Sequence, residues 1–335
     1  MNAKKLIIYL AKLTVTISIL YYWISITDFD NLLIELSKIN AFVFGLVFLL
    51  TILCTIIIPG MVTSECLQSE NMKIPLWELI KINFSMRFYS IVLPRGIATG
   101  MRWLRYKKWG NAQNALALLI FEKLIQISAM LSLGLLFLLI ETEIVLKDGY
   151  IVILLLSGLL LMFLLLILPF ISPGFNNISR NIIKRMDKFL PNAVTKRFEK
   201  LWKAVEEFQD LDKKHVYIII ALSFISNILL IINPIILAKG IDIDVNASMI
   251  AWIRALVFLF TLIPITVGGI GIRESGYVFF LGLYGIPQVE ALSLALLIFI
   301  IQIGIGLIGA LMDIYKFFLD IILHNRSGNP DNIKP

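Results

Sequence analysis

The sequence carries little charge and few residues suited to metal or redox chemistry. Of its 335 residues only 16% are charged, with two cysteines and two histidines. Ordinary soluble domains contain about 25% charged residues, so the composition excludes an ordinary water-soluble protein. Cys54 and Cys66 have no metal-ligand spacing, and His215 and His324 lie far apart. We therefore expect ordinary thiols, no metal, no cofactor and no catalytic triad.

Hydrophobic residues, by contrast, make up 59% of the chain. They gather in runs of about 20 residues, the length that an α-helix needs to cross ~30 Å of hydrocarbon. The clearest runs are 5–26, 41–62, 114–140, 150–172, 215–238, 247–263 and 288–312. We therefore expect an all-α polytopic membrane protein with about 7–8 transmembrane helices. It forms a single integral membrane domain over residues 1–320, followed by a polar tail at 321–335.

Basic residues concentrate in two of the loops. The segment 95–108 holds several basic residues and no acid, and 173–214 holds ten basic and six acidic residues. Lys and Arg near span ends are retained in the cytoplasm, so we expect the N-terminus and loop 173–214 to be cytoplasmic, in what we take to be a prokaryotic cytoplasmic membrane. The net charge of +7 then reflects topology, and we expect no nucleic-acid partner. The second half of 173–214 is amphipathic, which suits either contact with headgroups or a partner, or a connector that packs on the protein.

Two apolar regions are interrupted. The first breaks at Leu93-Pro94, and the second breaks at Ile263-Pro264 and continues through Gly268-Gly269-Ile270-Gly271. Non-helical backbone at membrane depth is tolerated only beside protein or a water-filled cavity, so each break predicts a discontinuous or re-entrant helix pair. If 272–285 crosses the membrane, the C-terminus is inside; if it returns, the C-terminus is outside.

The two broken regions also resemble each other. In both, an arginine follows the break, then a turn, then the sequence Ala-Leu-Leu-Ile-Phe, at 117–121 and 295–299. This order predicts an internal repeat, with halves at about 1–172 and 215–320 joined by 173–214. Paired interrupted segments in two halves are typical of a transport site near the membrane midplane.

The second break predicts an anion site. Pro264 removes a backbone donor, and Gly268, Gly269 and Gly271 free the backbone, so a helix begins near Gly271 with open amides and Arg273 in its first turn. A lipid phosphate is the natural anion inside a membrane protein. The alternative is that the glycines permit tight helix crossing and that Arg273 pairs with Glu274.

The first break predicts complementary cations. Arg95 and Arg102 follow Pro94, and guanidinium groups bind phosphate bidentately. Glu122 and Lys123 lie inside the next span, where ionisable groups are costly and functional by default. They either pair with Arg102, gate a lipid path or form a structural ion pair.

The last span carries two further polar or small-residue features. Gln302 either lines a cavity or joins two helices by hydrogen bonding. Residues 304–309 spell a Gly-x-Gly-x-x-Gly pattern, but no strand precedes it, as a dinucleotide site requires. We expect these glycines to form a face for close helix packing.

Residues Pro264 to Glu274, followed by Gly285-Ile286-Pro287, resemble the signature of the flippase-like transmembrane domain of lysylphosphatidylglycerol synthases and their stand-alone relatives. Leu93-Pro94, Gly100, Arg102 and Glu122-Lys123 resemble that family's first-half pattern, and the likeness covers about residues 5–315. The resemblance implies movement of a phospholipid or a polyprenyl-phosphate-linked lipid between leaflets. In fused relatives a C-terminal domain transfers lysine; we expect that domain to be absent here.

Three functions follow as expectations. The favoured one is a lipid flippase that holds the headgroup phosphate at the broken-helix site and is not an enzyme. The second is a non-catalytic membrane partner that supplies a lipid-linked substrate to a glycosyltransferase. The third is a membrane-embedded lipid-modifying transferase, for which Glu122 and Glu274 are the best candidate carboxylates.

Overall fold

The computed structural model describes residues 3–69, 73–93, 95–110, 112–141, 212–262, 266 and 268–327, together with short pieces between 153 and 161. Within these residues the chain forms helices and turns and no strand, which confirms the all-α prediction. In chain order the helices are α1 (Ala3–Ile26), α2 (Phe29–Ser37), α3 (Ala41–Ile52), the π-helical η1 (Leu53–Ile57), α4 (Ile58–Cys66), the 3₁₀ turn η2 (Leu67–Ser69), α5 (Leu76–Val92), α6 (Arg95–Lys107), α7 (Ala112–Leu138), α12 (Lys213–Gly240), α13 (Ala247–Leu262), α14 (Ile272–Gly282) and α15 (Gln288–Ser327).

Four of the described helices are long and apolar enough to cross a membrane. They are Ala41–Cys66, Leu118–Leu138, Lys213–Gly240 and Gln288–Leu319, and they confirm the spans expected at 41–62, 114–140, 215–238 and 288–312. The chain is therefore an integral membrane protein. α1 and α13 form where spans were expected at 5–26 and 247–263 but are not among these four. The span at 150–172 and segment 173–214 lie largely outside the described residues, so the total of seven or eight stays a prediction.

The helix Ala41–Cys66 is continuous but changes its winding in the middle. Pro59 cannot donate to the carbonyl four residues before it, and the segment just ahead of it, Leu53–Ile57, is π-helical. π-Helical turns within longer helices occur frequently at functional sites. Cys54 in this segment and Cys66 at the end of α4 are buried and form no disulfide within the described residues.

Both predicted breaks are present. α5 ends at Val92, Leu93 is extended, as a residue before proline is expected to be, and α6 begins at Arg95. α13 ends at Leu262, and α14 begins at Ile272 with Gly271 as its N-cap. Gly268, Gly269 and Gly271 have φ angles of 65°, 79° and 87°, which residues with a Cβ rarely adopt. Whether α6 and α14 re-enter or cross the membrane stays a prediction.

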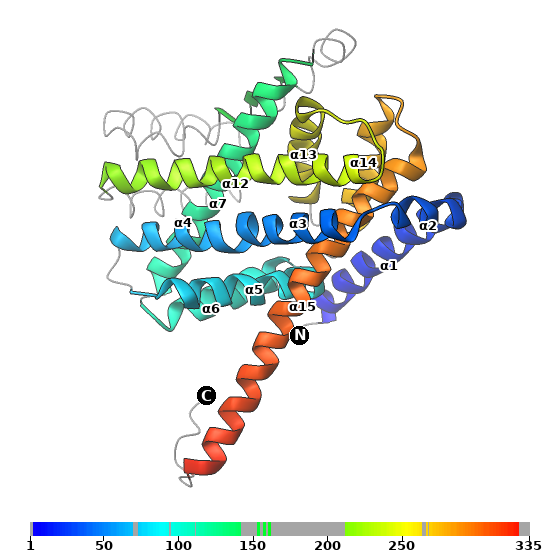
Figure 1. Ribbon diagram of the computed structural model, residues 1–335. Helices are drawn as coiled ribbons and strands as arrows, with labels where there is room; N and C mark the ends of the chain where they lie inside the picture. Colours follow the sequence, from blue (N-terminus) through cyan, green and yellow to red (C-terminus); the bar gives the residue numbers. More distant parts are fainter. Residues whose placement is uncertain are drawn as a thin grey trace.

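Close packing of α15 on α5 connects the two predicted repeat halves (Figure 1). A Cβ added at Gly309 would lie 2.1 Å from the carbonyl oxygen of Phe84, and one at Gly304 would lie 2.8 Å from the ring of Phe48 in α3. Only glycine allows backbones to approach this closely. The prediction that the Gly-x-Gly-x-x-Gly pattern is a packing face is confirmed.

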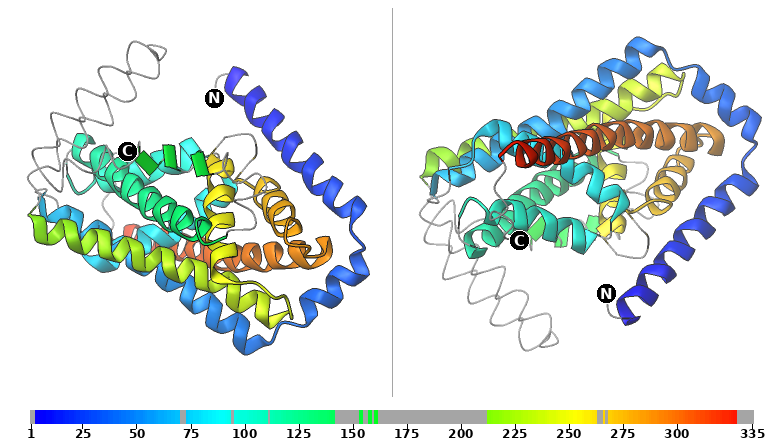
Figure 2. Two further views of the ribbon diagram at one scale, coloured as in Figure 1. Left: turned by 90° about the horizontal axis from the view of Figure 1, so that it is seen from above. Right: turned by 90° about the horizontal axis from the view of Figure 1, so that it is seen from below.

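The remaining helices surround this pair. α12 runs beside α3 and α4, and α7 packs on α13 (Figures 1 and 2). α1 lies along the edge of the molecule, and its Trp23 Nε1 donates a hydrogen bond to Ser275 Oγ of α14 over 2.8 Å. The C-terminal part of α15 extends away from the other described helices (Figure 1). This arrangement places residues from the middles of several helices around one cavity.

Candidate functional site

A cavity of about 560 Å³ lies between the four candidate membrane spans. Each span contributes a polar lining residue from near its middle, namely Thr55, Gln126, Asn227 and Gln302. The volume is within the usual range for small-molecule sites. Polar groups at the middle of a membrane span are costly, and their presence marks a pathway or site.

Five cationic side chains line this cavity, and each comes from a different helix. They are Arg87 of α5, Arg102 of α6, Lys123 of α7, Arg254 of α13 and Arg273 of α14. Among the described lining residues there is no Asp or Glu. The cavity wall is therefore strongly electropositive, which suits an anion and disfavours a cation.

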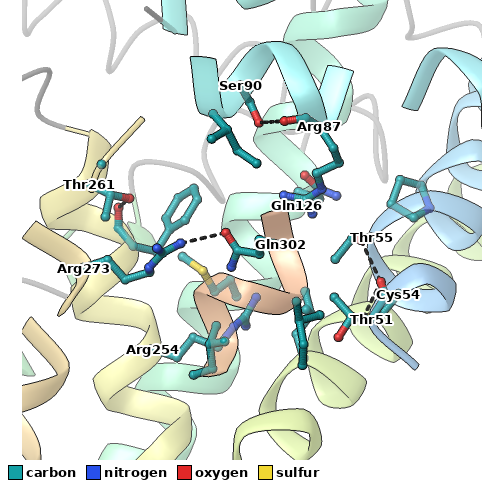
Figure 3. Close-up of a pocket in the computed structure, with 18 of the residues that line it drawn as sticks. Thr51, Cys54, Thr55, Arg87, Ser90, Gln126, Arg254, Thr261, Arg273 and Gln302 are labelled. Atoms are coloured by element: carbon teal, nitrogen blue, oxygen red, sulfur yellow. Dashed lines mark hydrogen bonds between the residues drawn. The ribbon is translucent and has the colours of Figure 1, made fainter. Parts of the chain in front are cut away.

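Arg273 is fixed by partners on two helices. Its Nε donates to Glu274 Oε1 over 3.0 Å, and its Nη1 donates to Gln302 Oε1 of α15 over 2.7 Å. The guanidinium also lies over the Phe299 ring, with its Cζ 4.7 Å from the ring centroid. Figure 3 shows Arg273 and Gln302 pointing toward one another within the cavity. Arg273 thus lines the cavity and pairs with Glu274 at the same time.

The start of α14 already has an anion of its own. The backbone N–H of Gly271 donates to Glu274 Oε2 over 2.6 Å. This is the half of a capping box that a glycine N-cap can form, since glycine has no side chain to accept from the Glu274 amide. The Arg273 amide is also used, because it donates to the Gly269 carbonyl. Two of the amides near this helix start, those of Gly271 and Arg273, are therefore bonded within the protein, and the phosphate site expected there stays a prediction.

Arg102 is held even more completely. Its Nη2 lies 3.1 Å from Glu122 Oε2 of α7, and the same nitrogen donates to Asn83 Oδ1 and to Tyr106 Oη. Of the alternatives for Glu122, the structure contains the pair with Arg102. The Lys123 ammonium, its neighbour in sequence, lies 5.1 Å from the Phe258 ring centroid of α13.

Arg87 and Arg254 differ from these two arginines. Within the described residues neither forms an ion pair with a carboxylate. Arg254 Nη1 donates a single hydrogen bond, to Asn227 Oδ1 over 3.3 Å, so most of its five N–H donors are available. Figure 3 shows the two side chains approaching the region of Gln302 from different elements. Arg87, Arg102, Arg254 and Arg273 line the same cavity, and a bound anion would relieve the repulsion between their like charges.

A comparison with protein families shows to which family the chain belongs. The family model for the lysylphosphatidylglycerol synthase transmembrane region matches residues 9–309. The chain belongs to this family. A search of curated proteins finds no match.

This membership confirms the family resemblance noted from residues Pro264 to Glu274 and covers nearly the whole chain. The matched model is that of the transmembrane region, and no model of a catalytic domain matches. The cavity described above therefore belongs to the membrane domain of this family.

The predicted site residues fall into three groups. Those that line the cavity are Gly268, Gly269, Arg273, Arg102, Lys123 and Gln302. Gly271, Glu122 and Glu274 are absent from the described lining; Glu122 and Glu274 pair with the lining residues Arg102 and Arg273, and Gly271 donates to Glu274. Pro94, Pro264 and the side chain of Arg95 lie outside the described residues.

Two lining cations were not predicted as site residues. Arg254 lies inside the apolar run 247–263, and Arg87 lies in the interrupted apolar region before Pro94. An arginine inside an apolar span is itself a signal of a functional site, and that signal was available for Arg254. Among the described residues no group of three or more His, Cys, Asp or Glu side chains could hold a metal.

Proposed function

We propose that this protein moves an anionic phospholipid or a polyprenyl-phosphate-linked lipid between the leaflets, with the headgroup phosphate bound in the cationic cavity. The observation that carries this proposal is the group of five cations around a cavity at the middle of the candidate spans, with no described carboxylate among the lining residues. A phosphate crossing bare hydrocarbon loses its hydration at a very large cost. Guanidinium groups at that depth replace the lost hydration with charge-assisted hydrogen bonds.

The arrangement also favours release. Arg102 and Arg273 each have an internal carboxylate, Glu122 or Glu274, that competes with a ligand for the guanidinium. A transported group must bind well enough to enter and weakly enough to leave. Arg102 and Arg273, whose charges are balanced by Glu122 and Glu274, favour release, and Arg87 and Arg254 favour binding.

Family membership supports a lipid as the transported molecule. The family is named for an enzyme whose product is the lipid lysylphosphatidylglycerol, and this chain matches the transmembrane region of that family. We place the N-terminus and loop 173–214 on the cytoplasmic side, in keeping with their basic residues.

The test is leaflet exchange in proteoliposomes with fluorescent phosphatidylglycerol, lysylated phosphatidylglycerol and polyprenyl phosphate. Arg254→Gln removes one charge from the cavity and is expected to slow exchange of the transported lipid by about 10–100-fold, since a hydrogen bond to a charged group contributes about 1.5–3 kcal/mol. Lys107→Gln, an exposed cation on α6, serves as the matched control and is expected to leave the rate unchanged. Exchange of every lipid at the protein-free rate would refute the proposal.

A further inference from the structure

The cavity wall is not neutralised by the protein. Of its five cations, Arg102 is balanced by Glu122 and Arg273 by Glu274. The Lys123 ammonium has contacts of its own, among them the Phe258 ring. Arg87 and Arg254 are left without a carboxylate within the described residues. Uncompensated charges at membrane depth are costly and persist where a ligand or pathway uses them. The ligand is therefore expected to bring the missing negative charge with it.

We infer that the site selects a lipid whose headgroup ends in a phosphate monoester over one whose phosphate is a diester. This inference rests on the proposed function and specifies the substrate class of the same cavity. A phosphate monoester carries about −1.5 to −2 charges near pH 7, whereas a diester carries about one. Two uncompensated guanidiniums, Arg87 and Arg254, match the monoester.

The number of acceptor oxygens leads to the same choice. A monoester presents three terminal oxygens and a diester presents two, and each arginine has five N–H donors in a planar fork. Arg87, Arg254 and Arg273 belong to α5, α13 and α14 and line one cavity (Figure 3). Arginines from three helices thus line the cavity, as many as a monoester has terminal oxygens.

The lining amides suit a headgroup of this kind as well. Gln126 and Asn227 line the cavity beside the arginines, and Asn227 Oδ1 already accepts from Arg254 over 3.3 Å. This bond orients the Arg254 guanidinium but uses only one of its donors. The cavity of about 560 Å³ holds a phosphate and leaves space for the part of the lipid attached to it.

Binding of matched lipids to the full chain in phosphatidylcholine nanodiscs tests the inference. The probes are dioctanoyl phosphatidate, a monoester; dioctanoyl phosphatidylmethanol, the diester that differs from it by one methyl group; and farnesyl phosphate, a monoester on an isoprenoid chain. We expect at least one monoester to bind about tenfold or more tightly than phosphatidylmethanol. The order of the two monoesters distinguishes a glycerolipid source from an isoprenoid source. Equal affinity of both monoesters and the diester would overturn the inference, and this result needs no variant.

Two variants assign the preference to residues. Arg87→Gln and Arg254→Gln are each expected to reduce the monoester preference severalfold, while Lys107→Gln keeps it. A preference that is unchanged in both folded cavity variants would overturn the assignment. Different results would refute the two proposals. If monoester and diester bind equally but lipid exchange still depends on Arg254, the substrate preference is refuted and translocation is not. A monoester preference without exchange of any lipid refutes translocation alone.

Discussion

The two broken regions of this protein have the same order of elements but hold their arginines differently. In the first, α5, a break, α6, a turn and α7 follow one another, and in the second α13, α14 and α15 do the same. Each region contributes one uncompensated arginine from the helix before the break, Arg87 or Arg254, and one paired arginine from the short helix after it. This correspondence supports the predicted repeat.

The difference lies in what holds the paired arginine. Arg102 is bound by Glu122 from another helix and by Asn83 and Tyr106. Arg273 is bound by the adjacent Glu274, which also caps α14, and by Gln302. Both arginines connect helices, but only the second lies at a helix start whose shape depends on glycine. We infer that the first region is the more rigid part of the wall and the second the more adjustable part.

The largest expected effect tests this difference through the two carboxylates. Glu122→Gln should lower the free energy of unfolding by about 3 kcal/mol, because it leaves the Arg102 charge uncompensated in a buried place. Glu274→Gln should cost about 2 kcal/mol, because an amide oxygen still accepts from the Gly271 N–H and Arg273 keeps Gln302. Equilibrium unfolding in mixed detergent micelles measures both.

The matched control for this pair is Glu78→Gln, which removes the partly exposed partner of Lys81 on α5 and should cost less than about 1 kcal/mol. Equal losses for Glu122→Gln and Glu274→Gln would contradict the proposed difference between the regions. A loss no larger than that of the control would show that the buried pairs contribute little to stability.

Much of the fold and part of the site could be predicted from the sequence. Pro94, Pro264 and the glycines at 268–271 disrupt helices locally, so both breaks are visible without tertiary information. The pair of Arg102 with Glu122 was one of the alternatives, because a charge inside an apolar run needs a partner. These features depend on neighbours in sequence or on simple charge balance.

Other features depend on how distant helices pack. Nothing local shows that Arg87 of α5 and Arg254 of α13 line the same cavity, since residues 93–246 separate their helices. The use of the Gly271 amide by Glu274 depends on a side-chain conformation. A Glu three residues after an N-cap is nevertheless the capping-box pattern, so that signal could have been found.

A smaller effect separates the glycines of the two breaks. Gly271 has a φ of 87°, and a Cβ there would lie 2.8 Å from Ile19 Cγ2 of α1, so Gly271→Ala should lower stability by about 1–3 kcal/mol. Gly100 lies within α6, and a Cβ there meets no described atom within 4 Å. Gly100→Ala should therefore raise stability by up to about 1 kcal/mol. Thermal unfolding followed by circular dichroism measures both, and shifts of the same sign would contradict this contrast.

The smallest effect concerns the two glutamines of the cavity. Gln302→Met removes the acceptor of the 2.7 Å hydrogen bond from Arg273 and should lower the free energy of unfolding by about 1 kcal/mol. Gln126→Met changes a residue on the same cavity whose side chain has no hydrogen-bond partner within the described residues, and it should cost less than about 0.5 kcal/mol.

Gln302→Met and Gln126→Met also test whether the hydrogen bond to Gln302 keeps Arg273 from binding a ligand. With Gln302 replaced, Arg273 keeps Glu274 but gains free N–H groups that face the cavity. A bound phosphate can use those donors, so Gln302→Met should bind the transported lipid at least as tightly as the parent protein. Gln126→Met adds no donor and should not tighten binding. Weaker binding in Gln302→Met would mean that Gln302 itself contacts the headgroup, and that the second broken region holds its ligand through an amide as well as through Arg273.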